Sequence, residues 1–260
     1  MGNLPPLPRE RRRTIRSLAS RKIRRRKGLC LVEGQRAIEE AARSGHLEYL
    51  VAEDPAVLAG LEVGQAGGMD QIPVFLADGA LFEDVSDVVH HRNLLGVARL
   101  PAEPEISPLL QMDGRAVLLF LDGVQDPGNV GALIRSAWVL GGAGILVGRG
   151  TADPFGHKAV RASAGGIFHL PVFMEVGRED LISLSGAGFR VYLAKARERS
   201  FGQVDFAPRS ILAVGNEGSG LSPWMVELGT PVSVPLCTEA DSLNVVVAGS
   251  ILLWAMLSGP

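Results

Sequence analysis

The sequence predicts an α/β protein in which a mostly parallel sheet carries helices on both faces, preceded by a smaller α/β unit. Apolar runs of strand length alternate with segments of helical spacing along most of the chain. Glycine is abundant, at 32 residues, whereas aromatic residues make up only 5%. This composition suits many strand-to-helix turns better than a β-sandwich. With 260 residues, 47% of them hydrophobic, the chain is long enough for one large domain or two small ones.

The smaller unit is expected over residues 28–100. Four apolar runs predict strands, and "QRAIEEAARSG" between the first two has the spacing of a helix that closes at Gly45. The strand candidates are "LCLVEG", "LEYLVAED", "IPVFLAD" and "LLGVARL". Residues 101–114, "PAEPEISPLLQMDG", are rich in proline and acid and have no periodicity, so we expect a linker there.

The pattern then restarts more strongly over residues 115–260. "AVLLFLD" is a continuous apolar run of the kind found in buried parallel strands, and "GILVG", "LPVFM", "RVYLAK", "SILAVG" and "PVSVPL" follow, separated by segments of helical spacing. Ligands of such sheets gather at the carboxyl ends of the strands. We therefore search for functional residues in the loops that follow these runs.

The charge of the chain is distributed unevenly. Residues 1–27 carry eleven Lys or Arg against one Glu, a balance of +10 in a protein whose formal net charge is −2. This basic N-terminal segment has helical character and predicts a polyanionic partner, of which nucleic acid is the commonest. The alternatives are a solvated disordered tail or an Arg-rich organellar transit segment.

Other features argue against a membrane and a metal. The run at the end of the chain, residues 242–260, contains three serines, an asparagine and two glycines, and its apolar stretch falls short of the ~18 residues that span a bilayer, so we expect a buried or subunit-interface helix. The two cysteines, Cys30 and Cys237, are far apart and form no CxxC pair, which disfavours a zinc site and a disulfide scaffold. No apolar signal-peptide core occurs at the N-terminus, and we expect a cytoplasmic protein.

Three loops after predicted strands hold the unusual residues. In "DPGNVGALIRSA", Arg135 is the single charged residue between Asn129 and Val147, and a lone arginine in an apolar helix implies a partner or a cleft. The other two loops are "AVGNEGSGLSP" and "VPLCTEADSLNVVVAG". Structural explanations exist for single residues: Asn129 and Ser242 are good helix N-caps, and Arg135 could belong to a structural ion pair. Neither glycine loop matches G-x-G-x-x-G or a Walker A sequence.

Taken together, "NVGALIRSA", "GNEGSGLS" and "VPL…DSLNVVVA" resemble the three motifs of the SpoU or TrmH family of RNA ribose 2′-O-methyltransferases, members of the SPOUT superfamily. The amino-terminal segment "RKGLCLVEGQRAIEEAARSG" is similar to the L30e-like substrate-binding domain of the ribosomal-RNA members. The resemblance implies a catalytic domain with a deep carboxyl-terminal trefoil knot, a rare exception to unknotted topology. It also implies S-adenosylmethionine as the cofactor, RNA as the substrate and an obligate homodimer.

The resemblance assigns roles to residues of all three loops. The catalytic set is Asn129, Arg135, Glu217, Ser242 and Asn244, and the cofactor-binding set is Gly215, Asn216, Gly218, Val234, Leu236 and Leu243. Within the first set, we expect Arg135 to act on the 2′-hydroxyl and Glu217 to hold Arg135. Thr238 and Val246 depart from the residues common in the third motif. Thr238 would be strained if its position required a positive φ.

The leading hypothesis is methyl transfer from S-adenosylmethionine to a ribose 2′-hydroxyl, and we expect the substrate to be ribosomal RNA of the large subunit. Transfer RNA is an alternative substrate, and a non-catalytic RNA-binding or ribosome-assembly factor on the same fold is an alternative class. A nucleotide-binding oxidoreductase is disfavoured by the missing dinucleotide fingerprint. The methylated nucleotide is not readable from the sequence.

Overall fold

The structure is a computed structural model that describes residues 4–61, 72–85, 93–238 and 242–258. The chain forms two compact units: unit 1 combines Met1–Pro101 with Asp153–His169, and unit 2 combines Ala102–Ala152 with Leu170–Pro260. The chain therefore passes between the units three times. The 115–260 range expected as one domain is interrupted, because its residues Asp153–His169 pack within unit 1.

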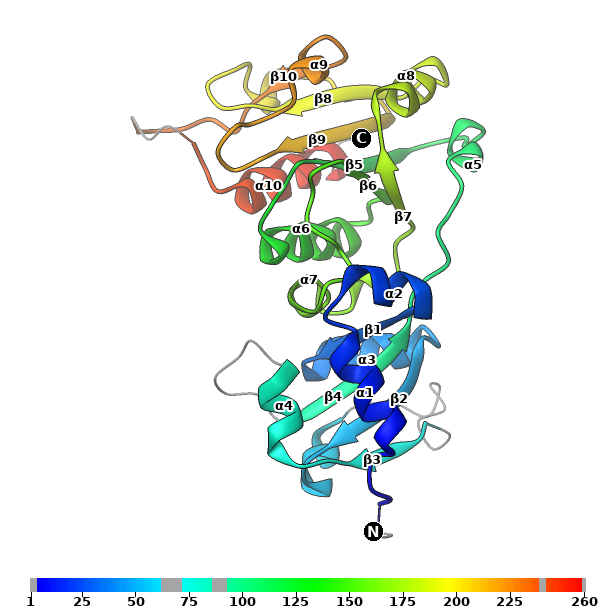
Figure 1. The fold of residues 1–260 in the computed structure, drawn as a ribbon. Coiled ribbons are helices and arrows are strands. Elements are labelled where there is room, and N and C mark those ends of the chain that lie inside the picture. The colour runs from blue at the N-terminus through cyan, green and yellow to red at the C-terminus, as the bar shows by residue number, and fades with distance from the viewer. Residues whose placement is uncertain (1–3, 62–71, 86–92, 239–241, 259–260) are drawn as a thin grey trace. The chain divides into compact units, whose positions relative to one another are not determined.

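Unit 1 contains a four-stranded mixed sheet in the order β1-β4-β2-β3. Strand β4 is antiparallel to β1 and β2, and β3 is parallel to β2. The elements, shown in Figure 1, are β1 (Leu29–Glu33), β2 (Leu47–Ala52), β3 (Val74–Leu76), β4 (Leu94–Arg99), α1 (Arg9–Ser17), α2 (Arg21–Lys27), α3 (Gln35–Arg43), α4 (Gly79–Val85), α7 (His157–Ala162) and the 3-10 turns Pro55–Gly60 and Gly166–Phe168.

The basic N-terminal segment is helical and forms part of the core of unit 1. Ile15 on α1 and Leu18 after it are fully buried against strands of the sheet. Arg11 lies over the rings of Tyr49 and Phe75, with its guanidinium carbon 4.5 and 4.4 Å from the ring centroids. These contacts contradict the alternative of a solvated disordered tail, because a tail would leave the apolar side chains in water.

Unit 2 contains a six-stranded sheet in the order β10-β8-β9-β5-β6-β7, in which every described pairing is parallel. The elements are β5 (Ala116–Asp122), β6 (Gly144–Gly148), β7 (Val172–Val176), β8 (Arg190–Ala194), β9 (Arg209–Gly215), β10 (Thr230–Val232), α5 (Ser107–Leu110), α6 (Pro127–Leu140), α8 (Arg178–Gly186), α9 (Pro223–Val226), α10 (Val245–Ser258) and the 3-10 turn Phe201–Gln203. The predicted parallel α/β class is confirmed.

Helices cover both faces of this sheet. Leu118 and Phe120 of β5 belong to the core cluster that includes residues of α5, α8 and α9, whereas α6 and α10 pack together and α10 contacts β5 and β9 (Figure 1). Strand β5 is buried along its whole length, as its continuous apolar run predicts. Gly249 lets α10 approach closely, because a Cβ there would lie 2.8 Å from the Leu133 side chain on α6.

The segment expected as a linker, 101–114, is part of unit 2. It contains the short helix α5, and Leu109 is buried in the same core cluster as β5. The Arg209 guanidinium donates to the Leu109 carbonyl at 3.2 Å. The linker expectation was wrong for these residues because the apolar side chains among the prolines are too few to show periodicity but still fill the core.

Helix α10 has 14 residues. Among the described residues, no helix combines the length and apolar character that crossing a bilayer requires.

Candidate active site

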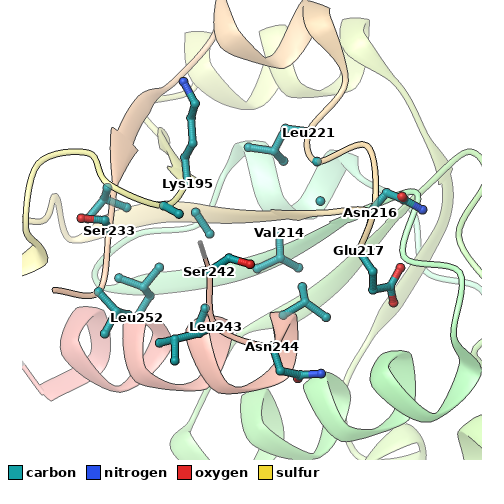
Figure 2. Close-up of a pocket in the computed structure, with 18 of the residues that line it drawn as sticks. Lys195, Val214, Asn216, Glu217, Leu221, Ser233, Ser242, Leu243, Asn244 and Leu252 are labelled. Atoms are coloured by element: carbon teal, nitrogen blue, oxygen red, sulfur yellow. The ribbon is translucent and has the colours of Figure 1, made fainter. Parts of the chain in front are cut away.

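A cavity of about 400 Å³ opens at the carboxyl ends of β8 and β9, beside the start of α10. Figure 2 shows side chains from these elements and from the loops after β9 and β10 pointing toward it. Its lining consists of Ala194, Lys195, Ala196, Val214, Gly215, Asn216, Glu217, Gly218, Gly220, Leu221, Val232, Ser233, Val234, Leu236, Ser242, Leu243, Asn244, Val245, Ala248 and Leu252. The edge of the sheet is the one where a parallel α/β fold places its ligands.

The structure brings most of the predicted site residues together here. All six residues of the cofactor-binding set line the cavity, and so do three of the catalytic set: Glu217, Ser242 and Asn244. Sequence analysis missed Lys195, Val214 and Leu252, among others. Lys195 directly follows β8, so the same rule about carboxyl ends of strands could have found it.

The loop after β9 is a closed ring of backbone. The Asn216 N–H donates to the Gly220 carbonyl at 2.9 Å, and the Gly220 N–H donates back to the Asn216 carbonyl at 3.0 Å. The Asn216 side chain accepts from the N–H groups of Gly218 and Ser219, both at 2.9 Å, and donates to the Gly123 carbonyl at 2.9 Å. The closure requires glycine at 215, because a Cβ there would lie 2.4 Å from the carbonyl carbon of Gly220.

Glu217 joins this loop to the start of α6. Its carboxylate accepts from the Asn129 side-chain amide at 2.9 Å and from the N–H groups of Gln125 and Asp126 at 3.2 and 3.4 Å. Burial raises the pKa of Glu217, but the hydrogen bonds, led by that of Asn129, outweigh it and hold the pKa below its ordinary value. The carboxylate is therefore ionised at neutral pH.

Asn129 is free for this contact because another residue caps α6. The N-cap is Asp126, whose carboxylate accepts from the Asn129 N–H at 2.9 Å, and Pro127 occupies the first helical turn. The structural explanation of Asn129 as an N-cap is wrong. Its side chain instead connects the first predicted motif to the second.

At the final helix the capping residue is also different from the one expected. Helix α10 begins at Val245, and the Asn244 side chain accepts from the Val246 N–H at 2.8 Å, which is the geometry of an N-cap. Ser242, the expected cap, lies two residues earlier, is exposed and lines the cavity. Among the residues described in the structure, it has no hydrogen-bond partner.

Arg135 does not lie where the expected pairing with Glu217 would place it. It is exposed on α6, does not line the cavity and forms no ion pair with Glu217 in the described part of the chain. The expectation that Glu217 holds Arg135 was wrong. Arg135 comes six positions after Asn129, which places the two side chains roughly 240° apart around the helix axis. Glu217 meets Asn129, so it cannot also face Arg135.

Two charged side chains mark the cavity. Within the described lining, Glu217 is the one carboxylate and Lys195 the one cation, and Figure 2 shows them at separate ends. The Lys195 ammonium lies 2.8 Å from the Glu198 carboxylate, and its side chain is about half exposed. The described residues contain no cluster of three or more metal-binding side chains.

The departures at Thr238 and Val246 leave the backbone unstrained. Thr238 is absent from the described non-glycine residues with positive φ, so the strain considered above does not arise. Val246 is half-buried and contributes its N–H to the Asn244 cap.

Comparisons with known proteins identify the family of the chain. The model of the SpoU rRNA methylase family matches residues 116–254, and that of the MRM3-like substrate-binding domain matches residues 10–95. The chain is 31% identical to the 23S rRNA (guanosine(2553)-2′-O)-methyltransferase RlmP of Bacillus subtilis over 243 residues, covering 92% of each chain. It is 31% identical to a 23S rRNA (adenosine(1067)-2′-O)-methyltransferase of Streptomyces laurentii, covering 76% of this chain and 80% of the relative.

Solved structures show the same architecture. An rRNA methyltransferase from Sinorhizobium meliloti, solved with S-adenosylmethionine bound, superposes with a TM-score of 0.77 at 26% identity, covering 97% of this chain and 96% of the other. Together with the family match over more than half of the sequence, these findings show that the chain belongs to the SpoU rRNA methylase family.

Proposed function

We propose that this protein is an S-adenosylmethionine-dependent methyltransferase that modifies a ribose 2′-hydroxyl of large-subunit ribosomal RNA. The observation that carries the proposal is the cavity at the carboxyl ends of β8 and β9, where residues from two of the three predicted motifs meet and the third is joined through Asn129. The relatives from Bacillus and Streptomyces act on 23S rRNA, but on different nucleotides. Similarity therefore supports the class of reaction and leaves the target nucleotide to experiment.

The cavity fits S-adenosylmethionine in size and chemistry. Its volume of about 400 Å³ lies within the range of small-molecule pockets. Its walls combine apolar side chains, such as Leu236 and Leu252, with the backbone of the glycine loop and with one carboxylate and one ammonium. A ligand with a flat purine, a sulfonium and a zwitterionic end needs such a mixture. We assign its binding to Gly215, Asn216, Gly218, Val234, Leu236 and Leu243.

When bound, the cofactor supplies an electrophilic methyl group for the ribose oxygen. The residues around it would act by positioning, which can contribute about 7 to 11 kcal/mol to lowering a barrier. Glu217 holds Asn129 and the start of α6 against the glycine loop. Ser242 and Asn244 lie in the cavity wall. There we assign them the roles of positioning the ribose and fixing the loop backbone.

Arg135 is assigned to the RNA side of the reaction. It is exposed and lies outside the cavity, so the ribose and its phosphate have access to it. An arginine with a pKa above about 12 does not accept a proton, so its role is to orient the 2′-hydroxyl and to stabilise the charge that develops on its oxygen. The hydroxyl proton leaves to an RNA phosphate or to water.

RNA is recognised by the exposed basic face of α1 and α2 in unit 1. The arginines of these helices fall into two groups. The first group, which includes Arg11, Arg12, Arg16 and Arg24, contacts the protein itself, through aromatic rings, Asp78, Asp84 and Asp153 respectively. The exposed cations that face solvent include Arg9, Arg13, Lys22 and Arg26. They occur at i and i+4 on each helix, so each pair projects from one side, where phosphates can be contacted.

The assembly that we propose is a homodimer formed through α6 and α10. These helices pack together, with the Ser136 and Ser250 hydroxyls 2.7 Å apart, yet large apolar side chains remain in solvent. Val247 and Trp254 are 46% and 55% exposed and lie seven residues apart on one stripe of α10, and Val139 on α6 is 62% exposed. A second copy of this face would cover them. We place the protein in the cytoplasm, with its rRNA substrate, and propose the trefoil knot between β9 and α10.

The test is methyl transfer from labelled S-adenosylmethionine to RNA of a strain that lacks the protein, followed by mapping of 2′-O-methyl sites. One new site in large-subunit RNA is expected. A site in transfer RNA would correct the substrate, and cofactor binding without any transfer, also to precursor particles, would favour a binding or assembly role. The Arg135→Ala variant should lose transfer while it keeps cofactor affinity and dimerisation, whereas loss of folding would make Arg135 structural.

A further inference from the structure

Asp122, at the carboxyl end of β5, is a buried carboxylate that the proposed reaction does not use. It is 5% exposed and does not line the cavity. Its two oxygens accept from Ser222: the Ser222 N–H donates to Oδ2 at 2.6 Å and the Ser222 hydroxyl donates to Oδ1 at 2.8 Å. No cation contacts this carboxylate in the described part of the chain. A buried charge without a counter-ion persists only where its hydrogen bonds compensate for lost hydration.

The position of Asp122 links it to the glycine loop. In the sheet Asp122 is paired with Gly215, the last residue of β9, where the loop departs. The loop returns at Ser222, the N-cap of α9. Asp122 therefore stands beside the residue where the loop begins and binds the residue where it ends.

Between these ends the loop touches itself. Gly215 is in close contact with Gly220 and Leu221, and the residues from Gly215 to Leu221, apart from Ser219, line the cavity. The middle of the loop is anchored by Asn216 and Glu217, as described above. At the returning end, the described hydrogen bonds provide one side-chain anchor, the Asp122 carboxylate. The backbone bonds between Asn216 and Gly220 hold the turn of the loop, but without the Asp122 anchor Leu221, which follows the turn, could move away from Gly215 and widen the cavity.

We propose that Asp122 is a positioning residue for cofactor binding: by holding Ser222 it keeps the returning end of the glycine loop, at Leu221, against Gly215 and so sets the width of the cavity. The assignment rests on the proposed function, since it names what keeps that cavity in its binding shape. Asp122 acts through Ser222 and does not touch the cofactor.

The experiment measures dissociation constants of S-adenosylmethionine and S-adenosylhomocysteine by calorimetry for the full-length protein and for Ser222→Ala, Asp122→Asn and the double variant. Each single variant should bind both ligands about tenfold more weakly, because a buried hydrogen bond to a charged group is lost. The double variant should lose no more than the worse single one, because both changes break the same contact. In turnover assays the KM for S-adenosylmethionine should rise while kcat and the KM for RNA stay unchanged.

The matched control is Ser210→Ala, at the amino end of β9, the strand whose carboxyl end leads into the glycine loop. Ser210 is fully buried and its hydroxyl donates to the Ala207 carbonyl at 2.5 Å, so its removal tests the loss of a buried serine hydroxyl far from the loop. It should lower stability without changing either dissociation constant. Where Asp122→Asn fails to fold, Ser222→Ala decides, because it preserves the carboxylate and its bond from the Ser222 N–H.

Failure of the two proposals can be told apart. Wild-type protein that does not bind S-adenosylmethionine would overturn the proposed function and this assignment with it. Wild-type binding with unchanged affinity in the Ser222 variant would overturn the assignment alone, and so would an equal loss in Ser210→Ala.

Discussion

The two units hold distant segments together with different chemistry. In unit 1 a charged seam, defined by Arg24, Glu33 and Glu40 with Asp153, Arg161 and His169, joins the N-terminal part to residues 153–169. In unit 2 the loops at the cavity are joined by Asp122 and Glu217, whose carboxylates accept mainly from backbone N–H groups and from short polar side chains. In unit 1 the carboxylates contact guanidinium groups and an imidazole, whereas in unit 2 they contact chiefly backbone dipoles.

This difference follows from what each region must leave open. Arg24 donates to the Leu18 and Ala19 carbonyls at 2.7 and 2.8 Å as well as to Asp153, and Glu33 lies 2.6 Å from Arg161, so the seam is filled by its own side chains. Around the cavity, Glu217 in the wall and Asp122 behind it bind backbone groups of the loops, and so hold the loops in place without filling the space between them. Buried ion pairs stabilise only when both partners are present, whereas backbone anchors depend on a single side chain.

The largest effect is expected from Arg24→Ala. The change would leave the Asp153 carboxylate, 13% exposed, without its cation and two backbone carbonyls without a donor. The free energy of unfolding should fall by about 3 to 5 kcal/mol. Urea denaturation followed by circular dichroism measures it, with the exposed Arg26→Ala on the same helix as the control, which should change stability by less than about 0.5 kcal/mol.

A double variant sharpens this result. Arg24→Met combined with Asp153→Leu removes both charges together, and it should recover much of the loss if the penalty comes from an unpaired buried charge. A double variant as unstable as Arg24→Ala would show that the two backbone carbonyls, and not the ion pair, carry the effect.

In unit 2 the substitution expected to disrupt the glycine loop most is Gly215→Ala. The added Cβ would meet the backbone of Gly220 at 2.4 Å, and backbone cannot rotate away as a side chain can. S-adenosylmethionine affinity should fall about 10- to 100-fold, because overpacking forces the loop open. Gly218→Ala is the comparison: its Cβ would meet the Asn216 side-chain oxygen at 3.5 Å, an ordinary contact, so it should lose less affinity than Gly215→Ala although Gly218 belongs to the assigned binding set. Equal losses in both would mean that the loop tolerates no side chain at all.

Much of the fold was readable from the sequence, because buried parallel strands are continuous apolar runs. "AVLLFLD", "GILVG" and "SILAVG" correspond to β5, β6 and β9 within a residue at their ends. The partition into units was not readable. The segment 153–169 lies between two strands of the second sheet, and its attachment to unit 1 depends on charged pairs such as Glu33 with Arg161 that are 128 residues apart in sequence.

The candidate site was predicted better as a set of positions than as a set of contacts. Gly215, Leu236 and Leu243 line the cavity, as the motif resemblance implied. The expected pairing of Glu217 with Arg135 was wrong because α6 is capped by Asp126, three residues before the expected cap, Asn129. Asn129 therefore lies within the helix and points toward Glu217, and Arg135 lies on another side of the helix. Such a shift is invisible to a pattern in which Asn and Asp are equally good caps.

Glu217→Gln tests whether the backbone anchors of unit 2 depend on charge. The pKa of Glu217 lies below its ordinary value, so the folded protein binds this proton more weakly than the unfolded chain does. The stabilisation is then fully present above the unfolded pKa of about 4.3 and is lost as the pH falls through the lower folded value. The variant should be less stable than the wild type near neutral pH, by about 1 kcal/mol. The difference should shrink as the pH falls through the lowered pKa of the folded protein.

The measurement is the free energy of unfolding of Glu217→Gln and of the wild type, each determined from neutral pH to acid pH. A gap that stays constant with pH would show that the shape of the side chain matters and its charge does not. Asp78→Asn serves as a control, because the pKa of Asp78 is also lowered, chiefly by the hydrogen bond from Arg12, but this carboxylate belongs to unit 1 and does not line the cavity of unit 2.

The smallest effect on stability, below about 0.5 kcal/mol, is expected from the exposed cations of α1 and α2. Deleting residues 1–27 would also remove the buried Ile15 and Leu18 and break the core of unit 1, so the sharper variant is Arg13→Gln with Arg26→Gln, both exposed. RNA affinity should fall, and the slope of log affinity against log salt should flatten by about 1 to 2, because fewer phosphate counterions are released. The control is Arg190→Gln, an exposed cation at the amino end of β8 in unit 2, which should leave the slope unchanged. An unchanged slope in the double variant would show that the exposed arginines of α1 and α2 do not contact RNA phosphates. These helices would then serve only the core and the seam of unit 1, and RNA would bind elsewhere on the protein.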